Sequence, residues 1–195
     1  MLFYILTIVI GTILIILGNT FAVPFEWMNL WTNSWHTVLG VVAIIAIDGI
    51  GALAIRRLLP MSWFKPERRL FQVSKREHKF YNKIKIKSWK DKVPELGGFT
   101  NFHKSELKSS SDSKYLERFI IETNYGVIIH LENAILGFLI FLIPWCSAPS
   151  IWIPIFAVNL VLSMLPVFIL RYTDYTLIRL YNKQKKLEEK KEKEA

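Results

Sequence analysis

The sequence has a single cysteine and lacks the short motifs by which several enzyme classes are recognised. Cys146 has no second cysteine with which to form an intramolecular disulfide or a metal site. No G-x-S-x-G, P-loop or G-x-G-x-x-G pattern is present, which disfavours a serine hydrolase, a P-loop nucleotidase and a dinucleotide-binding enzyme. An H-x-x-x-x-D acyltransferase box is also missing. We therefore expect neither a metal nor a bound cofactor.

Charged residues are nearly absent from four long apolar stretches. The 195 residues are 52% hydrophobic, although the chain carries a net charge of +9. Residues 2–21 contain no charge, and residues 36–59 contain Asp48 and two terminal arginines. Two further stretches cover residues 120–145 and 150–170. Because about 20 apolar residues suffice to cross a bilayer as a helix, the pattern predicts an all-α integral membrane protein with four transmembrane helices.

The positions of the cations predict how the chain is oriented. All 25 Lys and Arg residues fall in two blocks, residues 56–118 and 171–193. Basic segments stay on the cytoplasmic side, so we predict a multi-pass cell-membrane protein with both termini and the central loop in the cytoplasm. A cleaved signal peptide is the alternative for residues 2–21, but no cation precedes this stretch and no A-x-A-like site follows it. Its removal would not change the orientation of the other three helices.

Composition divides the chain into four segments, which are the first helix pair (1–59), a surface loop (60–119), the second pair (120–172) and a charged tail (173–195). In the loop, the stretch SKREHKFYNKIKIKSWKDKVPELGG (residues 74–98) alternates cations with aromatic and aliphatic residues. This composition is typical of a basic amphipathic segment that lies on anionic headgroups. The K-I-K-I-K run within it fits a helix or a strand. Nucleic acid is an improbable partner, because the cations follow the sides of the membrane.

The third apolar stretch carries polar residues on one helical face. Glu122, Gly126, His130, Asn133 and Gly137 follow one another at steps of four, four, three and four. Ionisable groups inside a span are costly and so are candidates for function, and histidine is suited to proton transfer near neutral pH. Glu122 and His130 are separated by about 12 Å along the axis, so a third group would have to join them. Alternatively, the stripe serves helix packing.

Two other polar residues lie in apolar stretches. Asp48 is expected to pair with Arg56 or Arg57, or with a histidine on a facing helix, if it has no functional role. Asn159 is expected to form a structural hydrogen bond.

Three segments resemble a known family. They read FQVSKREHKFYNKIKIKSWKDKVPELGG, IETNYGVIIH and PVFILRYTDYTLIRL, in this order. On these segments the chain resembles the glycosyl-4,4'-diaponeurosporenoate acyltransferase family of staphyloxanthin-type carotenoid biosynthesis. The matching positions are Phe71, Glu77, Phe80, Tyr81, Trp89, Lys90, Glu122, Thr123, His130, Arg171, Tyr172 and Leu177. The sequence departs from the family pattern at Asp174, where a basic residue is expected, and at Leu131, where an aromatic residue follows the histidine.

The resemblance implies transfer of a fatty acyl group to a sugar hydroxyl of a glycolipid, such as a glycosylated carotenoid, at the cytoplasmic leaflet. The acyl donor would be a co-substrate such as an acyl carrier thioester. His130 is the expected general base, with Glu122 as its catalytic companion. The expected substrate-binding residues are Phe80, Tyr81, Trp89, Lys90, Thr123, Arg171, Tyr172 and Arg179. The alternative is a non-enzymatic membrane subunit that binds anionic lipid or docks a partner enzyme.

Overall fold

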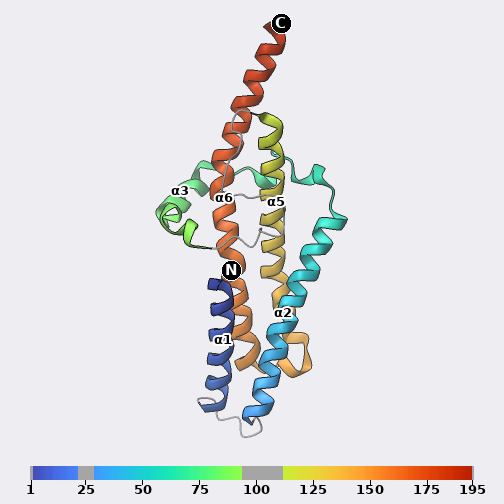
Figure 1. Ribbon diagram of the computed structural model, residues 1–195, viewed down its shortest axis with the longest axis vertical. Coiled ribbons are helices and arrows are strands. Elements are labelled where there is room, and N and C mark those ends of the chain that lie inside the picture. The colour runs from blue at the N-terminus through green and yellow to red at the C-terminus, as the bar shows by residue number, and fades with distance from the viewer. Residues whose placement is uncertain (1, 22–28, 94–111, 195) are drawn as a thin grey trace. The chain divides into compact units, whose positions relative to one another are not determined.

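The computed structural model describes residues 2–21, 29–93 and 112–194, and these residues form helices and no strand (Figure 1). The α-helices are α1 (Leu2–Phe21), α2 (Leu30–Leu58), α3 (Lys75–Lys83), α4 (Ile86–Trp89), α5 (Ser113–Leu136) and α6 (Pro149–Glu194). Short 3-10 helices are η1 (Met61–Phe64), η2 (Arg69–Phe71), η3 (Lys90–Lys92), η5 (Gly137–Leu142) and η6 (Pro144–Cys146).

Four of these helical segments are long and apolar enough to cross a membrane: α1, α2, α5 continued by η5, and α6. The predicted all-α fold with four membrane helices is thereby confirmed. One predicted limit differs from the structure. The second helix begins at Leu30, so Trp31 and Trp35 belong to it and not to an interfacial turn; the other part of that turn, residues 22–28, lies outside the described residues. Asn29 caps this helix by accepting a hydrogen bond from Thr32 N (2.8 Å).

The helix α5 begins seven residues before the third apolar stretch. The Asp112 side chain accepts hydrogen bonds from Lys114 N (2.9 Å) and Tyr115 N (3.3 Å), which satisfies free amides at the helix start. At the other end of the chain, α6 runs from Pro149 to Glu194 without interruption, so the charged tail continues the fourth membrane helix. The division into four segments by composition stays a prediction.

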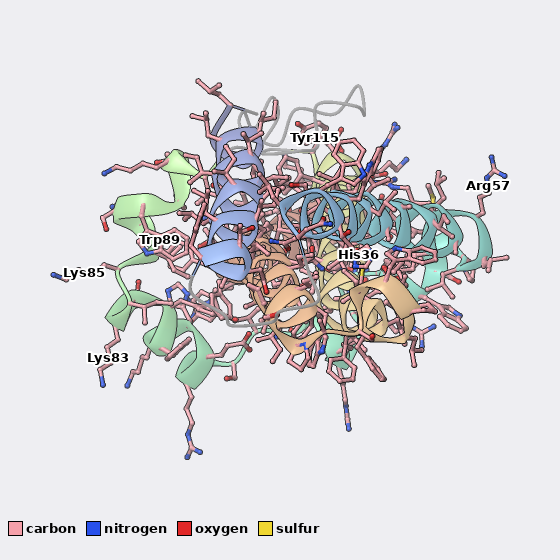
Figure 2. All side chains as sticks on the ribbon, turned by 90° about the horizontal axis from the view of Figure 1, so that it is seen from below. His36, Arg57, Lys83, Lys85, Trp89 and Tyr115 are labelled. Atoms are coloured by element: carbon pink, nitrogen blue, oxygen red, sulfur yellow. The ribbon has the colours of Figure 1, made fainter. Side chains whose placement is uncertain are left out.

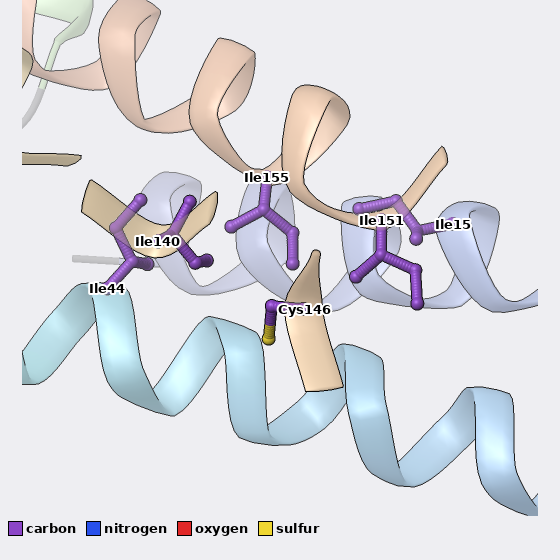
Figure 3. Close-up of a cluster of buried hydrophobic side chains, with 6 residues drawn as sticks. All are labelled: Ile15, Ile44, Ile140, Cys146, Ile151 and Ile155. Carbon is purple, nitrogen blue, oxygen red and sulfur yellow. The ribbon is translucent and has the colours of Figure 1, made fainter. Parts of the chain in front are cut away.

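By packing, the chain divides into two compact units, each described here by itself. Unit 1 comprises Met1–Ala54 and Ile129–Leu165, and unit 2 comprises Ile55–Ile128 and Pro166–Ala195. The core of unit 1 is aliphatic and draws on α1, α2, η5, η6 and α6. It consists of Ile15, Ile44, Ile140, Cys146, Ile151 and Ile155 (Figure 3). Gly40 permits the close packing, because a Cβ there would lie 2.9 Å from Cys146 Sγ.

Polar side chains join the helices of unit 1 where water is scarce. Asn19 Nδ2 donates to the Ser150 carbonyl (2.9 Å), and Asn33 Nδ2 donates to the Ile16 carbonyl (2.8 Å). Hydrogen bonds of this kind each stabilise membrane helix pairs by about 0.6–2 kcal/mol.

The core of unit 2 lies between α5 and α6. It consists of Leu116, Phe119, Ile120, Leu177, Ile178 and Tyr181. The segment after α2 is fixed to α5 by an aromatic stack and two hydrogen bonds. The rings of Phe64 and Tyr125 stack at 3.7 Å, Tyr125 Oη donates to the Leu59 carbonyl (2.7 Å), and Asn124 Nδ2 donates to the Phe64 carbonyl (2.8 Å).

The basic segment is helical, which decides between the helix and the strand left open by its sequence. Ser74 caps α3 by accepting from Glu77 N (3.1 Å). Lys85 has a left-handed backbone (φ 54°, ψ 41°) between α3 and α4. The predicted placement of its apolar side in the headgroup region is wrong for Phe71, Tyr81 and Ile86, which are buried in the protein. The reason is that α6 extends as a helix past its apolar stretch and offers protein surface, as the Tyr81–Phe168 ring contact shows (6.1 Å).

Candidate functional site

Glu77 of α3 and Arg171 of α6 form a two-point ion pair in unit 2. Arg171 Nε donates to Glu77 Oε1 (2.5 Å), and Arg171 Nη2 donates to Glu77 Oε2 (2.9 Å). The third nitrogen, Nη1, donates to the Leu70 carbonyl (3.2 Å). Parallel pairing of this kind is the strongest geometry available to a guanidinium and a carboxylate. Arg171 therefore fixes both α3 and η2 on α6, and all three of its side-chain nitrogens are bonded.

Tyr81 completes this polar cluster. Its hydroxyl, one turn after Glu77 on α3, donates to Glu77 Oε1 (2.7 Å). Partial burial opposes ionisation of Glu77, but the hydrogen bonds from Arg171 and Tyr81 outweigh it, so the pKa of Glu77 lies below its usual value of 4.5. Burial and the adjacent carboxylate raise the pKa of Tyr81. At neutral pH, Glu77 is therefore an anion, Arg171 a cation and Tyr81 a neutral donor.

His78, next to Glu77, lies in an aromatic stack on α6. Its imidazole is nearly parallel to the rings of Tyr175 (centroids 3.9 Å apart) and Tyr172 (5.2 Å). The guanidinium of Arg179 lies 4.8 Å from the centroid of the Tyr175 ring. Within the part of the chain that the structure describes, His78 Nδ1 is buried and has no hydrogen-bond partner. In unit 2, this imidazole follows Glu77 directly in the sequence and stacks on the same helix, α6, that carries Arg171.

Four other predicted substrate-binding residues have mainly local contacts. Phe80 packs edge-on against Phe168 of α6 (6.4 Å) and is half exposed. Trp89 Nε1 donates to the Ile84 carbonyl (3.0 Å), and Lys90 lies 3.3 Å from Asp91. The remaining residue is Thr123, which is buried and donates to the Phe119 carbonyl of its own helix (2.9 Å).

Glu122, a predicted catalytic residue, is paired with the end of α2. Arg56 Nη1 and Nη2 lie 3.3 and 3.2 Å from Glu122 Oε2, and the Arg56 guanidinium lies over the Tyr125 ring. The Glu122 side chain is 14% exposed and that of Arg56 is 39% exposed. The structure thus gives Glu122 a cationic partner on a neighbouring helix, within unit 2.

The other predicted catalytic residue, His130, lies on α5 in unit 1, half-buried. Asn133, one turn further along α5, accepts a hydrogen bond at its carbonyl from Asn159 Nδ2 of α6 (3.2 Å). Asn159 Nδ2 also lies 3.5 Å from Asp48 Oδ1 of α2. Asn159 is therefore a structural donor, as predicted. Asp48 therefore lies beside an amide of α6, and its expected pairing with Arg56, Arg57 or a histidine stays a prediction.

Glu132, which falls outside the predicted polar stripe, lies against α2. Its carboxylate occupies the space that a side chain at Gly51 would fill. In the amide orientation that satisfies its neighbours, Asn133 Nδ2 donates to Glu132 Oε2 (2.8 Å). Among residues 2–21, 29–93 and 112–194, no group of three His, Cys, Asp or Glu side chains could hold a metal ion.

Three of the residues predicted to form the site lie at the contact between α3 and α6, namely Tyr81, Arg171 and Tyr172. A fourth, Arg179, lies over the ring of Tyr175 in the same stack. His78 and Tyr175 were missed. The family pattern included Glu77, but no partner could be read from the sequence for it. The spacing of four residues between Glu77 and Tyr81 was the one local signal, since it places both on one helical face.

Residues 60–183 match the model of a protein family described as glycosyl-4,4'-diaponeurosporenoate acyltransferase. The chain belongs to this family. A search of curated proteins and a search of solved structures each found no match. Membership makes the chain an acyltransferase of carotenoid biosynthesis.

The matched range begins at Pro60 and ends at Lys183. It therefore includes the Glu77–Arg171 pair, the stack around His78, and both Glu122 and His130. The family match thus covers the residues of unit 2 through which α3 contacts α6. The helices α1 and α2 precede it.

Proposed function

We propose that this protein transfers a fatty acyl group to a sugar hydroxyl of a lipid-linked sugar, such as a glycosylated carotenoid, at the cytoplasmic leaflet of the cell membrane. Both termini and the basic loop lie in the cytoplasm. The observation that carries the proposal is the family match over residues 60–183. The acyl donor is a co-substrate, for example a thioester on an acyl carrier.

The reaction requires a proton acceptor and a group that stabilises negative charge. The acceptor takes the proton of the sugar hydroxyl, the hydroxyl oxygen bonds to the thioester carbonyl carbon, and the carbon–sulfur bond breaks. The leaving thiolate then takes up a proton. An imidazole suits the first step near neutral pH, and fixed cations or N–H donors suit the oxyanion that develops on the carbonyl.

Two imidazoles are candidates for the proton acceptor. His130 is supported by the family pattern and by its position on the polar face of α5 that includes Glu122. His78 is supported by its geometry, because it lies beside an ion pair and stacks on two tyrosines, with Nδ1 free of a hydrogen-bond partner among the described residues. We assign the role to His130 and give His78 the role of orienting substrate at the α3–α6 contact. Arg179 places a guanidinium 4.8 Å from the centroid of the Tyr175 ring in this stack.

The experiment is a transfer assay with detergent-purified protein, a glycosylated carotenoid acid and an acyl thioester. Loss of a general base lowers the rate by about two to four orders of magnitude, so His130→Ala is expected to have that effect on kcat. His78→Ala is expected to raise KM more than it lowers kcat. A control is His36→Ala, which removes the same side chain from α2, away from the family pattern.

Each outcome decides between assignments. Normal transfer by a well-folded His130→Ala protein would contradict the role of His130, and a large loss of kcat in His78→Ala would move the proton acceptor to α3. If wild-type protein transfers no acyl group to any glycolipid offered, the non-enzymatic alternative, a subunit that binds lipid or a partner enzyme, takes its place.

A further inference from the structure

The side of α3 that faces away from α6 is formed by cations. Glu77, His78 and Tyr81 contact α6 or its partners, which defines the inner side of the helix. With about 100° per residue, the opposite side carries four residues, all exposed. We call them the outer face of α3: Lys75, Arg76, Lys79 and Lys83. Figure 2 shows the side chains of Lys83 and Lys85 extending outward from the ribbon of their own segment.

The charge on this outer face is not offset by the acidic residue of the same helix. The one acid of α3, Glu77, is on the inner side and is neutralised by Arg171. Unlike the exposed end of α6, where Lys190 and Glu194 pair along the helix (3.5 Å), the outer face has cations at positions i, i+1, i+4 and i+8. Burying the acid in an internal ion pair therefore leaves the full positive charge toward the outside.

The outer face adjoins the apolar part of α6. Phe80 lies at its edge, and its ring is 50% exposed. The same ring packs on Phe168, which belongs to the last turn of the fourth apolar stretch, just before Arg171. The face thus begins at the level where α6 changes from apolar to charged residues, and an exposed aromatic ring beside cations is typical of the boundary between lipid tails and headgroups.

We propose that the outer face of α3 binds the phosphates of anionic phospholipids in the membrane that the protein spans, with Phe80 inserted between them at the headgroup level. Charge complementarity and the position of Phe80 support a lipid over an acidic soluble protein, because a soluble partner gains nothing from a cation cluster placed at the end of an apolar stretch. This binding surface is separate from acyl transfer and does not depend on it.

The test uses the full-length protein in detergent and native mass spectrometry with phosphatidylglycerol and phosphatidylcholine as probes. A lysine near an anionic surface contributes about a fivefold change in affinity. In the triple variant Lys75→Gln, Lys79→Gln and Lys83→Gln, the apparent Kd of phosphatidylglycerol is therefore expected to rise by about one to two orders of magnitude. Phosphatidylcholine binding is expected to stay unchanged, and raised salt is expected to weaken phosphatidylglycerol binding to wild type more than to the variant.

A matched control removes the same number of charges elsewhere. Lys190→Gln, Lys191→Gln and Lys193→Gln change the exposed end of α6, where cations alternate with glutamates, and are expected to leave phosphatidylglycerol binding unchanged. If both triple variants lose the same affinity for phosphatidylglycerol, the proposal is overturned in favour of an effect of net charge. If neither variant loses affinity, the outer face of α3 does not bind this lipid. Unchanged lipid binding together with a lost affinity for polyglutamate would assign the face to an acidic protein partner.

Discussion

The charge of Glu77 determines how firmly α3 is held on α6. Its carboxylate accepts two hydrogen bonds from Arg171 and one from Tyr81, and these place its pKa below 4.5. A carboxyl whose pKa is lowered in the folded state contributes stability above its unfolded pKa, and this contribution is lost as the pH falls through the folded pKa. The bond between the two helices is therefore complete at neutral pH and weakens in acid.

Glu77→Gln is expected to lower the melting temperature of the purified protein at neutral pH. The variant loses charge-assisted hydrogen bonds, which each contribute about 1.5–3 kcal/mol, and leaves Arg171 half-buried without its counterion. The difference from wild type should shrink as the pH falls below 4.5, because wild-type Glu77 then becomes protonated as well. Circular dichroism melts of both proteins over a pH series measure this. A difference that is independent of pH would show that the charge of Glu77 contributes nothing.

The contacts of a single residue were predictable where they follow from its position inside a membrane helix. Asn159 was predicted to be a structural donor, because an amide inside a span requires a partner, and it donates to Asn133 and approaches Asp48. Arg171 stays a predicted substrate-binding residue, but its partner in the structure, Glu77, was not predicted. Such a pair joins residues 94 positions apart, and no helical or strand period relates residues at that separation.

At the scale of elements, the basic segment contains a break that its composition did not reveal. The sequence fits continuous helix or strand, but α3 ends at Lys83 and α4 begins at Ile86. Between them Lys85 has φ 54°, and among the described residues it is the one non-glycine residue with positive φ. A left-handed residue with a Cβ costs about 1–2 kcal/mol. The break turns the chain so that Ile86 becomes fully buried.

Replacing Lys85 by glycine is expected to stabilise the protein relative to Lys85→Ala by about 1 kcal/mol, because glycine adopts positive φ without a steric cost. Both variants lose the same cation, so their difference reports the backbone alone. Urea or thermal unfolding followed by tryptophan fluorescence is a suitable measurement, since one of the seven indoles, that of Trp89, is bonded to Ile84 at this break. The control is Lys87 of α4, where glycine is expected to be less stable than alanine by about 1 kcal/mol. The same order at both positions would contradict a left-handed Lys85.

The long helices were predictable in number, whereas the start of α2 was not. Apolar stretches of about 20 residues with few charges cross a bilayer as helices, which is why α1, α2, α5 and α6 were predictable. Their limits depend on polar contacts outside the apolar stretches. The Asp112 cap starts α5 early, and a bond from Ser113 N to Glu188 (3.2 Å) ties that start to the extended α6.

At the scale of the whole molecule, the arrangement of charge is the strongest constraint. All 25 cations lie in two blocks, 56–118 and 171–193, while the described residues between α5 and α6 contain none. Reversing the orientation would place every cation outside the cell and away from the anionic cytoplasmic leaflet, which attracts each nearby lysine or arginine by about 1 kcal/mol. The prediction that both termini lie in the cytoplasm rests on the sum of these contributions.

Cysteine labelling of intact cells tests the predicted orientation, with both termini in the cytoplasm. The native Cys146 is fully buried and is expected to give little background labelling. Ser147→Cys, which lies in the connection between η6 and α6, is expected to react with a membrane-impermeant maleimide added outside. Lys83→Cys on α3 and Lys193→Cys near the end of α6 are expected to react after the cells are permeabilised and not before. These two residues come from different basic blocks, so they must behave alike if an even number of helices separates them. Labelling of Lys83→Cys and Lys193→Cys in intact cells, with protection of Ser147→Cys, would show that the protein has the reverse orientation. A difference between the two lysine positions would show that the number of membrane crossings between the two basic blocks is not two. An acyl thioester made in the cytoplasm cannot cross the bilayer readily. The proposed transfer at the cytoplasmic leaflet therefore requires that Lys83→Cys and Lys193→Cys are protected in intact cells and that Ser147→Cys is labelled.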